Sequence, residues 1–119
     1  MSNGTLGQLA DFVAATRFSD LPDAVVLKAK RHGLDTIGVA LAGATSEEAI
    51  RTTRTLLRGG HAGTAPLWGT SSTLAPREAA LVNGVAAHAF ELDDTGGCDH
   101  SGAVVVPAVI AAAPLPAGW

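Results

Sequence analysis

Small side chains crowd the segment from residue 76 to residue 92. Within it lie Ala79, Ala80, Gly84, Ala86, Ala87 and Ala89. The segment opens with Pro76, and proline suits the first turn of a helix. Because small side chains let neighbouring helix backbones approach closely, we expect a central helix from Pro76 to about Leu92.

Four other segments combine helical spacing of apolar residues with signals for a helix start or end. They are Thr5 to about Thr16, Pro22 to about Ala42, Ser46 to Arg58, and a segment that begins near Ala103. Residues 63–70 are too rich in glycine for a helix and indicate a loop or one short extended piece. No segment has the alternation that is typical of strands. The sequence therefore predicts an all-α fold, a helical bundle.

Composition limits both the core and the partners. The 119 residues suffice for one small domain, and with 47% hydrophobic but 4% aromatic residues we expect a core of Ala, Val and Leu. A net charge of −3 and two lysines argue against binding to nucleic acid. The apolar stretch 103–113 is too short to cross about 30 Å of hydrocarbon, and the start carries no basic cluster. The single cysteine excludes an internal disulfide and fits a reducing compartment. Together with the lack of a visible signal segment or membrane span, this leads us to expect a soluble cytoplasmic protein.

Residues 88–102 hold four of the eleven acidic residues and two of the four histidines. If the helix runs far enough, His88, Glu91 and Thr95 share one narrow stripe, whereas Asp93 points to the opposite side. The glycine-rich turn that follows can fold His100 back toward that stripe. A carboxylate beside an imidazole is a usable acid–base pair for taking a proton from a carbon next to a carboxylate. The alternative without a catalytic role, a solvated acidic helix end followed by a glycine stop, stays open.

A metal site is the second interpretation of the same stretch. Its possible ligands are Glu91, Asp94, Asp99, His88 and His100. Their spacing matches neither a zinc signature nor a calcium loop, and Cys98 lacks a second thiol. We therefore expect no metal ion and no other cofactor. Asp99 would also oppose formation of a Cys98 thiolate, which argues against a cysteine nucleophile.

Several blocks of the sequence resemble the MmgE/PrpD family, which includes 2-methylcitrate dehydratase, cis-aconitate decarboxylase and related epimerases. They are residues 79–95 (AALVNGVAAHAFELDDT), 100–108 (HSGAVVVPA), 34–43 (LDTIGVALAG) and 67–70 (LWGT). The order and spacing agree from about Leu6 to Ala113. The resemblance implies the amino-terminal helical domain of a cofactor-free lyase or isomerase that acts on small polycarboxylates, usually as a dimer.

The resemblance also implies roles for individual residues. The acid, threonine and histidine of the family's active site match Glu91, Thr95 and His100, and we expect His88 and Asp94 to contribute to substrate binding. The family often has Asp in place of Glu91 and Pro in place of Ser101. These two differences leave dehydration, decarboxylation and epimerisation open.

The resemblance covers part of a family member. We expect residues 1–113 to form a partial helical domain and residues 114–119 to be a tail unlike the family, as in a truncated product. The resemblance implies that the rest of the helical domain and a second, α+β domain follow in family members, and that this later sequence supplies most of the cations that face the substrate. Two alternatives remain: an inactive helical fragment that docks on a partner chain, and a small metal-binding module.

Overall fold

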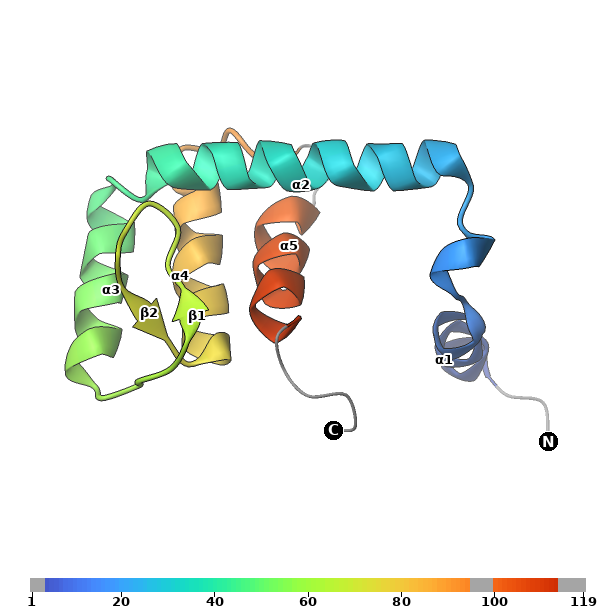
Figure 1. Ribbon diagram of the computed structural model, residues 1–119, viewed down its shortest axis with the longest axis horizontal. Coiled ribbons are helices and arrows are strands. Elements are labelled where there is room, and N and C mark those ends of the chain that lie inside the picture. Colours follow the sequence, from blue (N-terminus) through green and yellow to red (C-terminus); the bar gives the residue numbers. More distant parts are fainter. Residues whose placement is uncertain (1–3, 95–99, 114–119) are drawn as a thin grey trace. The chain divides into compact units, whose positions relative to one another are not determined.

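The chain divides into two units, Met1–Lys30 and Arg31–Trp119. Figure 1 shows the computed structural model, which describes residues 4–94 and 100–113. Helices dominate both units, and the predicted all-α class is confirmed.

The first unit contains α1 (Thr5–Ala15), the short 3-10 helix η1 (Phe18–Asp20) and the start of α2 (Asp23–Gly43). The Asp20 carboxylate accepts a hydrogen bond of 2.9 Å from the Arg17 backbone N–H, which closes the turn between α1 and α2. Helix α1 buries none of its residues, and its apolar side chains Leu6 and Phe12 are exposed. The helix thus forms where apolar spacing predicts it, although the described residues of its own unit do not bury its apolar face.

The second half of α2 belongs to the larger unit, in which Thr36, Ala40 and Gly43 are buried along one face. At Gly43 the backbone lies so close to α4 that an added Cβ would fall 1.8 Å from the Ala86 carbonyl oxygen. An added Cβ at Gly102 would likewise fall 2.7 Å from Thr36 Oγ1. This half of α2 therefore packs against the adjacent ends of α4 and α5.

Helix α3 (Glu47–Arg58) follows, and the Ser46 hydroxyl caps it by accepting the Ala49 backbone N–H at 3.1 Å. The next segment is a small antiparallel hairpin of β1 (Ala65–Pro66) and β2 (Thr73–Leu74), with Ala65 opposite Leu74. One short extended piece was predicted here, but the second strand was not. Because each strand has two residues, the alternation that signals a strand is too short to detect.

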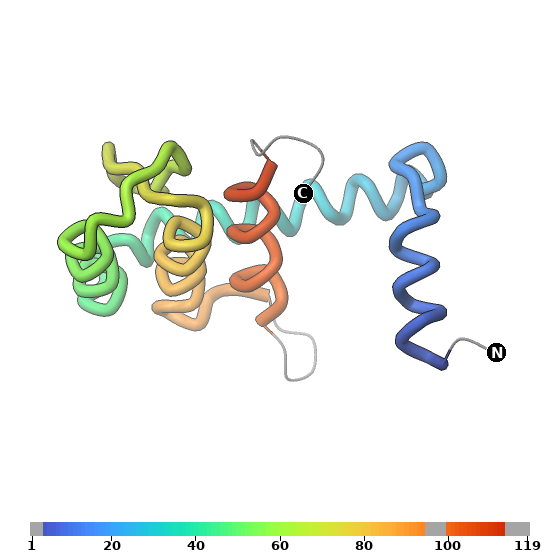
Figure 2. The backbone as a smooth tube through the Cα atoms, turned by 90° about the horizontal axis from the view of Figure 1, so that it is seen from below, coloured from blue at the N-terminus to red at the C-terminus, as the bar shows by residue number. Residues whose placement is uncertain are grey.

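Helix α4 (Pro76–His88) lies between α3 and α5 (Ser101–Ala112), as both views show (Figures 1 and 2). It buries Ala79, Ala86 and Ala87. At Gly84 an added Cβ would fall 2.9 Å from the Ala103 carbonyl oxygen, so α5 packs directly on the α4 backbone. The prediction that small residues make this the central helix is confirmed.

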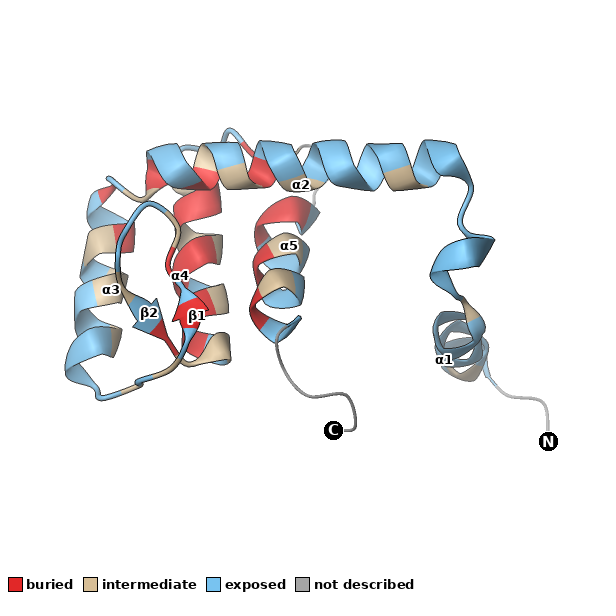
Figure 3. Cartoon of the chain, viewed as in Figure 1, coloured by how far each residue is buried: buried red, intermediate tan, exposed pale blue. Residues whose placement is uncertain are grey.

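The described core consists mainly of small aliphatic side chains, as the composition predicted. Two clusters form it, one around Leu67, Leu74 and Val82, the other around the alanines of α2, α3, α4 and α5. Figure 3 shows that buried positions line α4 and one side of α5. None of the described helices is both long and apolar enough to span a bilayer.

Candidate functional site

The site begins where α4 ends, which is earlier than the sequence predicted. The helix stops at His88 rather than near Leu92. The Glu91 backbone N–H then bonds to the His88 carbonyl at 2.9 Å, and Glu91 adopts a left-handed φ of 51°. Aspartate favours turns over helix interiors. Acidic side chains are also unfavourable near the C-terminus of a helix, because that end carries the negative pole of the helix dipole. The prediction that Glu91 shares a helical stripe with His88 is therefore wrong. The third member of that predicted stripe, Thr95, lies outside the described residues.

The chain reversal at Glu91 brings Asp93 between two histidines. Asp93 Oδ1 lies 3.2 Å from His88 Nδ1, and Asp93 Oδ2 lies 3.1 Å from His100 Nδ1. The Asp93 side chain is fully buried, whereas the two imidazoles are 46% and 39% exposed. The expectation that Asp93 points away from the other site residues is thus wrong. Asp93 joins His88 at the end of α4 to His100 at the start of α5.

When it is ionised, the Asp93 carboxylate determines which nitrogen of each ring carries a proton. An ionised carboxylate only accepts hydrogen bonds, so both Nδ1 atoms must donate. In a neutral ring the lone pair then lies on Nε2, the atom that can take a proton from a substrate. The two rings meet edge to face, with centroids 4.4 Å apart. Two imidazoles thus share one buried carboxylate and keep their Nε2 atoms available.

Asp94 fixes the start of α5 beside this pair. Its carboxylate accepts bonds from the Ser101 hydroxyl at 2.9 Å and from the Gly102 backbone N–H at 2.8 Å. Desolvation raises the pKa of Asp94, but these two bonds and the nearby His32 outweigh it and hold the pKa below its usual value of 3.8. This anchoring places His100, the residue before α5, opposite the end of α4.

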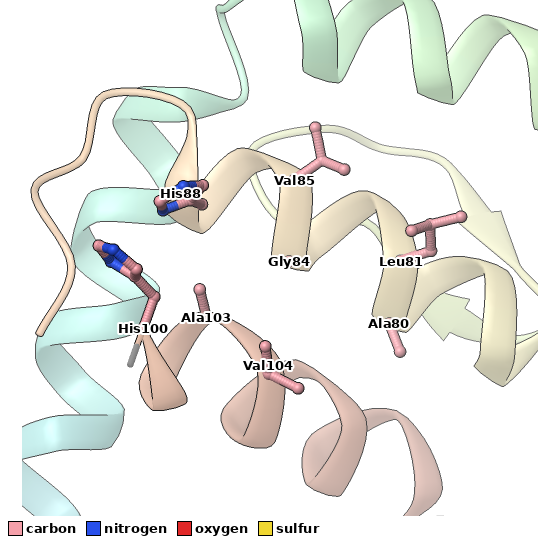
Figure 4. A pocket seen from close by; sticks show the side chains of 8 residues that line it. All are labelled: Ala80, Leu81, Gly84, Val85, His88, His100, Ala103 and Val104. Atoms are coloured by element: carbon pink, nitrogen blue, oxygen red, sulfur yellow. The ribbon is translucent and has the colours of Figure 1, made fainter. Parts of the chain in front are cut away.

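A cavity of about 440 Å³ lies between α4 and α5, and the two imidazoles are at one end of it (Figure 4). Its other lining residues are apolar: Ala80, Leu81, Gly84, Val85, Ala103 and Val104. No lysine or arginine is among the described residues that line it. The imidazoles are therefore its only titratable lining groups within the described part of the chain.

The remaining candidates lie apart from this cluster or outside the described residues. Glu91 is exposed. Thr95, Cys98 and Asp99 fall in the segment 95–99, which the structure does not describe. Of the predicted site residues, the structure brings together His88 and His100, with Asp94 holding the adjacent turn.

A second histidine–carboxylate contact lies at the start of α4. His61 Nδ1 is 3.5 Å from Glu78 Oε1, and the Arg77 guanidinium donates to the same oxygen at 2.9 Å. The Arg77 hydrogen bond is the main reason that the pKa of Glu78 is lowered. This pair makes His61 a useful control for the site at His88 and His100.

The chain is similar to known proteins over most of its length. The family model of the MmgE/PrpD N-terminal domain matches residues 7–115. The chain is 30% identical over 104 residues to cis-aconitate decarboxylase of Mus musculus. That match covers 86% of this chain and 21% of the mouse protein, so the chain spans about a fifth of the relative's length. No solved structure matches significantly.

Proposed function

Because this chain belongs to the MmgE/PrpD family, we propose that it is the amino-terminal helical part of a lyase or isomerase. The proposed substrate is a small polycarboxylate such as cis-aconitate or 2-methylcitrate, and the proposed chemistry is acid–base proton transfer without a cofactor. The observation that carries the proposal is the hydrogen-bonded cluster His88–Asp93–His100 at the end of the α4–α5 cavity.

In this proposal His100 is the general acid or base. Its Nδ1–H donates to Asp93, so its Nε2 lone pair takes a proton from the carbon next to a substrate carboxylate. The positive charge that develops on the ring is then stabilised by the buried carboxylate of Asp93. Asp93 is a positioning residue, since it orients the two rings and its own side chain does not reach the surface.

The electron pair left on carbon by deprotonation allows two outcomes. Expulsion of a hydroxide from the adjacent carbon gives dehydration, and return of a proton to the opposite face gives epimerisation. In decarboxylation, the reaction in the name of the mouse relative, loss of CO2 itself leaves the electron pair on carbon, and a protonated imidazole then supplies the proton. Each outcome begins or ends with a proton on an imidazole, which is the part of the site that this chain supplies.

The other predicted residues take supporting roles in the proposal. Glu91 and Thr95 orient the substrate and share the proton transfers, and His88 binds the substrate beside His100. Asp94 contributes through the turn that it anchors. The exposed position of Glu91 leaves its carboxylate free to move toward a substrate.

The described part of the site lacks the cations that a polycarboxylate requires. Two like charges about 4 Å apart repel by about 1 kcal/mol in water and by several times more in a partly buried site. The lining residues include acid–base groups but no lysine or arginine. We therefore propose that the compensating cations come from other polypeptide, either the remainder of the enzyme or a second subunit.

Deuterium exchange tests the proposal without requiring a complete site. The purified chain is incubated in D2O and EDTA with millimolar cis-aconitate or 2-methylcitrate, and exchange at carbon is followed by proton NMR. We expect exchange above the buffer background, lost in His100→Gln and retained in His61→Gln. Absence of exchange would refute the acid–base role, and full turnover at enzymatic rates would refute the partial site.

A docking role is the second candidate, because α5 leaves an apolar face exposed. Val104, Val105 and Val109 are 71%, 54% and 61% exposed. We propose that this face packs on another chain, such as a second copy in a homodimer. Light scattering on the purified chain tests this, and a monomer at all concentrations without aggregation would contradict it.

A further inference from the structure

We propose that His88, Asp93 and His100 also form a binding site for a divalent transition metal ion of the zinc type. This inference concerns the same cluster as the proposed function. It rests on the cluster's geometry and charge rather than on any reaction. Its test is made without substrate.

The donor set suits such an ion. The three side chains offer two imidazole nitrogens and a carboxylate oxygen, and the candidate ligand atoms all lie within 4.8 Å of one another. Imidazole and carboxylate are common zinc ligands at about 2.0–2.2 Å, which separates neighbouring ligands of a tetrahedral ion by about 3.3 Å. The observed N–O separations of 3.1 and 3.2 Å are close to that value. Each of these separations involves a different oxygen of Asp93, and the three candidate atoms span up to 4.8 Å, so the two rings would have to move toward one another to complete the coordination.

Charge also favours a cation at this position. The Asp93 side chain is fully buried, and its ion pairs within the described residues are with the two imidazoles. A buried carboxylate requires a compensating positive charge. The lining of the adjacent cavity supplies no lysine or arginine among the described residues. Either a ring proton or a metal ion can provide this charge, and a divalent ion contacts all three groups at once.

Metal binding and proton transfer exclude each other in this arrangement. Without a metal, both Nδ1 atoms carry protons toward Asp93 and the Nε2 lone pairs are available. An ion bound through Nδ1 takes that lone pair, so in a neutral ring the proton moves to Nε2. Nε2 is then an N–H donor and no longer a base. The ion would thereby inhibit the proposed acid–base chemistry.

Titration with Co2+ and Zn2+ tests the site directly. All samples carry Cys98→Ser, which removes the single thiol as a competing ligand. We expect one Co2+ per chain, with visible d–d absorption that Zn2+ displaces. His88→Gln and His100→Gln should each weaken binding at least about 10-fold. His61→Gln, which alters the other histidine–carboxylate pair, should leave affinity unchanged.

NMR of the imidazole nitrogens is measured with an unaltered His88–Asp93–His100 cluster. This second test therefore does not depend on whether the histidine variants fold. In the wild-type cluster, Zn2+ should move the proton from Nδ1 to Nε2 in both His88 and His100. The proposal is overturned by the absence of stoichiometric binding, by equal weakening in His61→Gln, or by unchanged tautomers on metal addition. Deuterium exchange in EDTA is unaffected by any of these results, so the two proposals can fail separately.

Discussion

Replacing Gly43 with alanine measures how closely α2 must approach α4. An added Cβ would lie 1.8 Å from the Ala86 carbonyl oxygen and 2.8 Å from its carbonyl carbon. Both are backbone atoms, so a side-chain rotation cannot relieve the overlap. Ala86 lies two residues before His88, and a shift here would also move one end of the histidine cluster.

Gly38→Ala is the matched control in the same helix. A Cβ at Gly38 meets nothing within 4 Å, and the position is exposed. Each substitution gains up to about 1 kcal/mol of helix propensity, so this term largely cancels between the two variants. Overpacking costs about 1–3 kcal/mol. The free energies of unfolding of the two variants should therefore differ by about this amount, with Gly38→Ala the more stable.

Thermal unfolding monitored by circular dichroism measures this difference. At about 4 °C per kcal/mol for a domain of this size, the midpoint temperatures should differ by about 4–12 °C. Equal stability of the two variants would show that α2 does not approach α4 as closely as the structure indicates.

Three further substitutions test other contacts. Asp94 has a lowered pKa, so its carboxylate stabilises the fold above pH 3.8 and loses that contribution as the pH falls below this value. Urea unfolding of Asp94→Asn should therefore show less loss of stability than wild type between pH 4 and pH 2. Asn83→Ala should lower the free energy of unfolding by about 2–4 kcal/mol in the same assay. It removes the hydrogen-bond partner of the Trp68 backbone N–H and of the Pro66 carbonyl, which Asn83 bonds at 2.9 and 3.0 Å. Ser46→Ala should cost about 1 kcal/mol through loss of the α3 cap, and thermal unfolding with no change would contradict that role.

The helices could be predicted from the sequence because their signals are local. Apolar spacing, the serine cap before α3 and the proline at the start of α4 all lie within a few residues of the helices they define. The small residues of α4 also predicted close packing, which Gly84 and Ala103 show directly. The hairpin was missed because strands of two residues are too short for a detectable alternation. The Asn83 side chain, which bonds the Pro66 carbonyl and the Trp68 backbone N–H, is also distant in sequence.

The arrangement of the site could be predicted only in part. The stretch 88–102 was identified from its histidines and acids, and two of those histidines do converge. The role of Asp93 was not predicted, because on a continuous helix Asp93 faces away from His88. The left-handed backbone at Glu91 reverses the chain and turns Asp93 inward. Adjacent aspartates after a helix were the available signal for that turn, since aspartate favours helix ends over helix interiors.

The shared Asp93 carboxylate is the feature on which both proposals depend, and nitrogen NMR of the histidine rings tests it most directly. In EDTA at pH 8, we expect His88 and His100 to carry their protons on Nδ1. Asp93→Asn should change the nitrogen signals of both rings together, while the His32 signal stays constant. Nε2–H tautomers at His88 and His100, or independent responses of the two rings, would contradict the bridge.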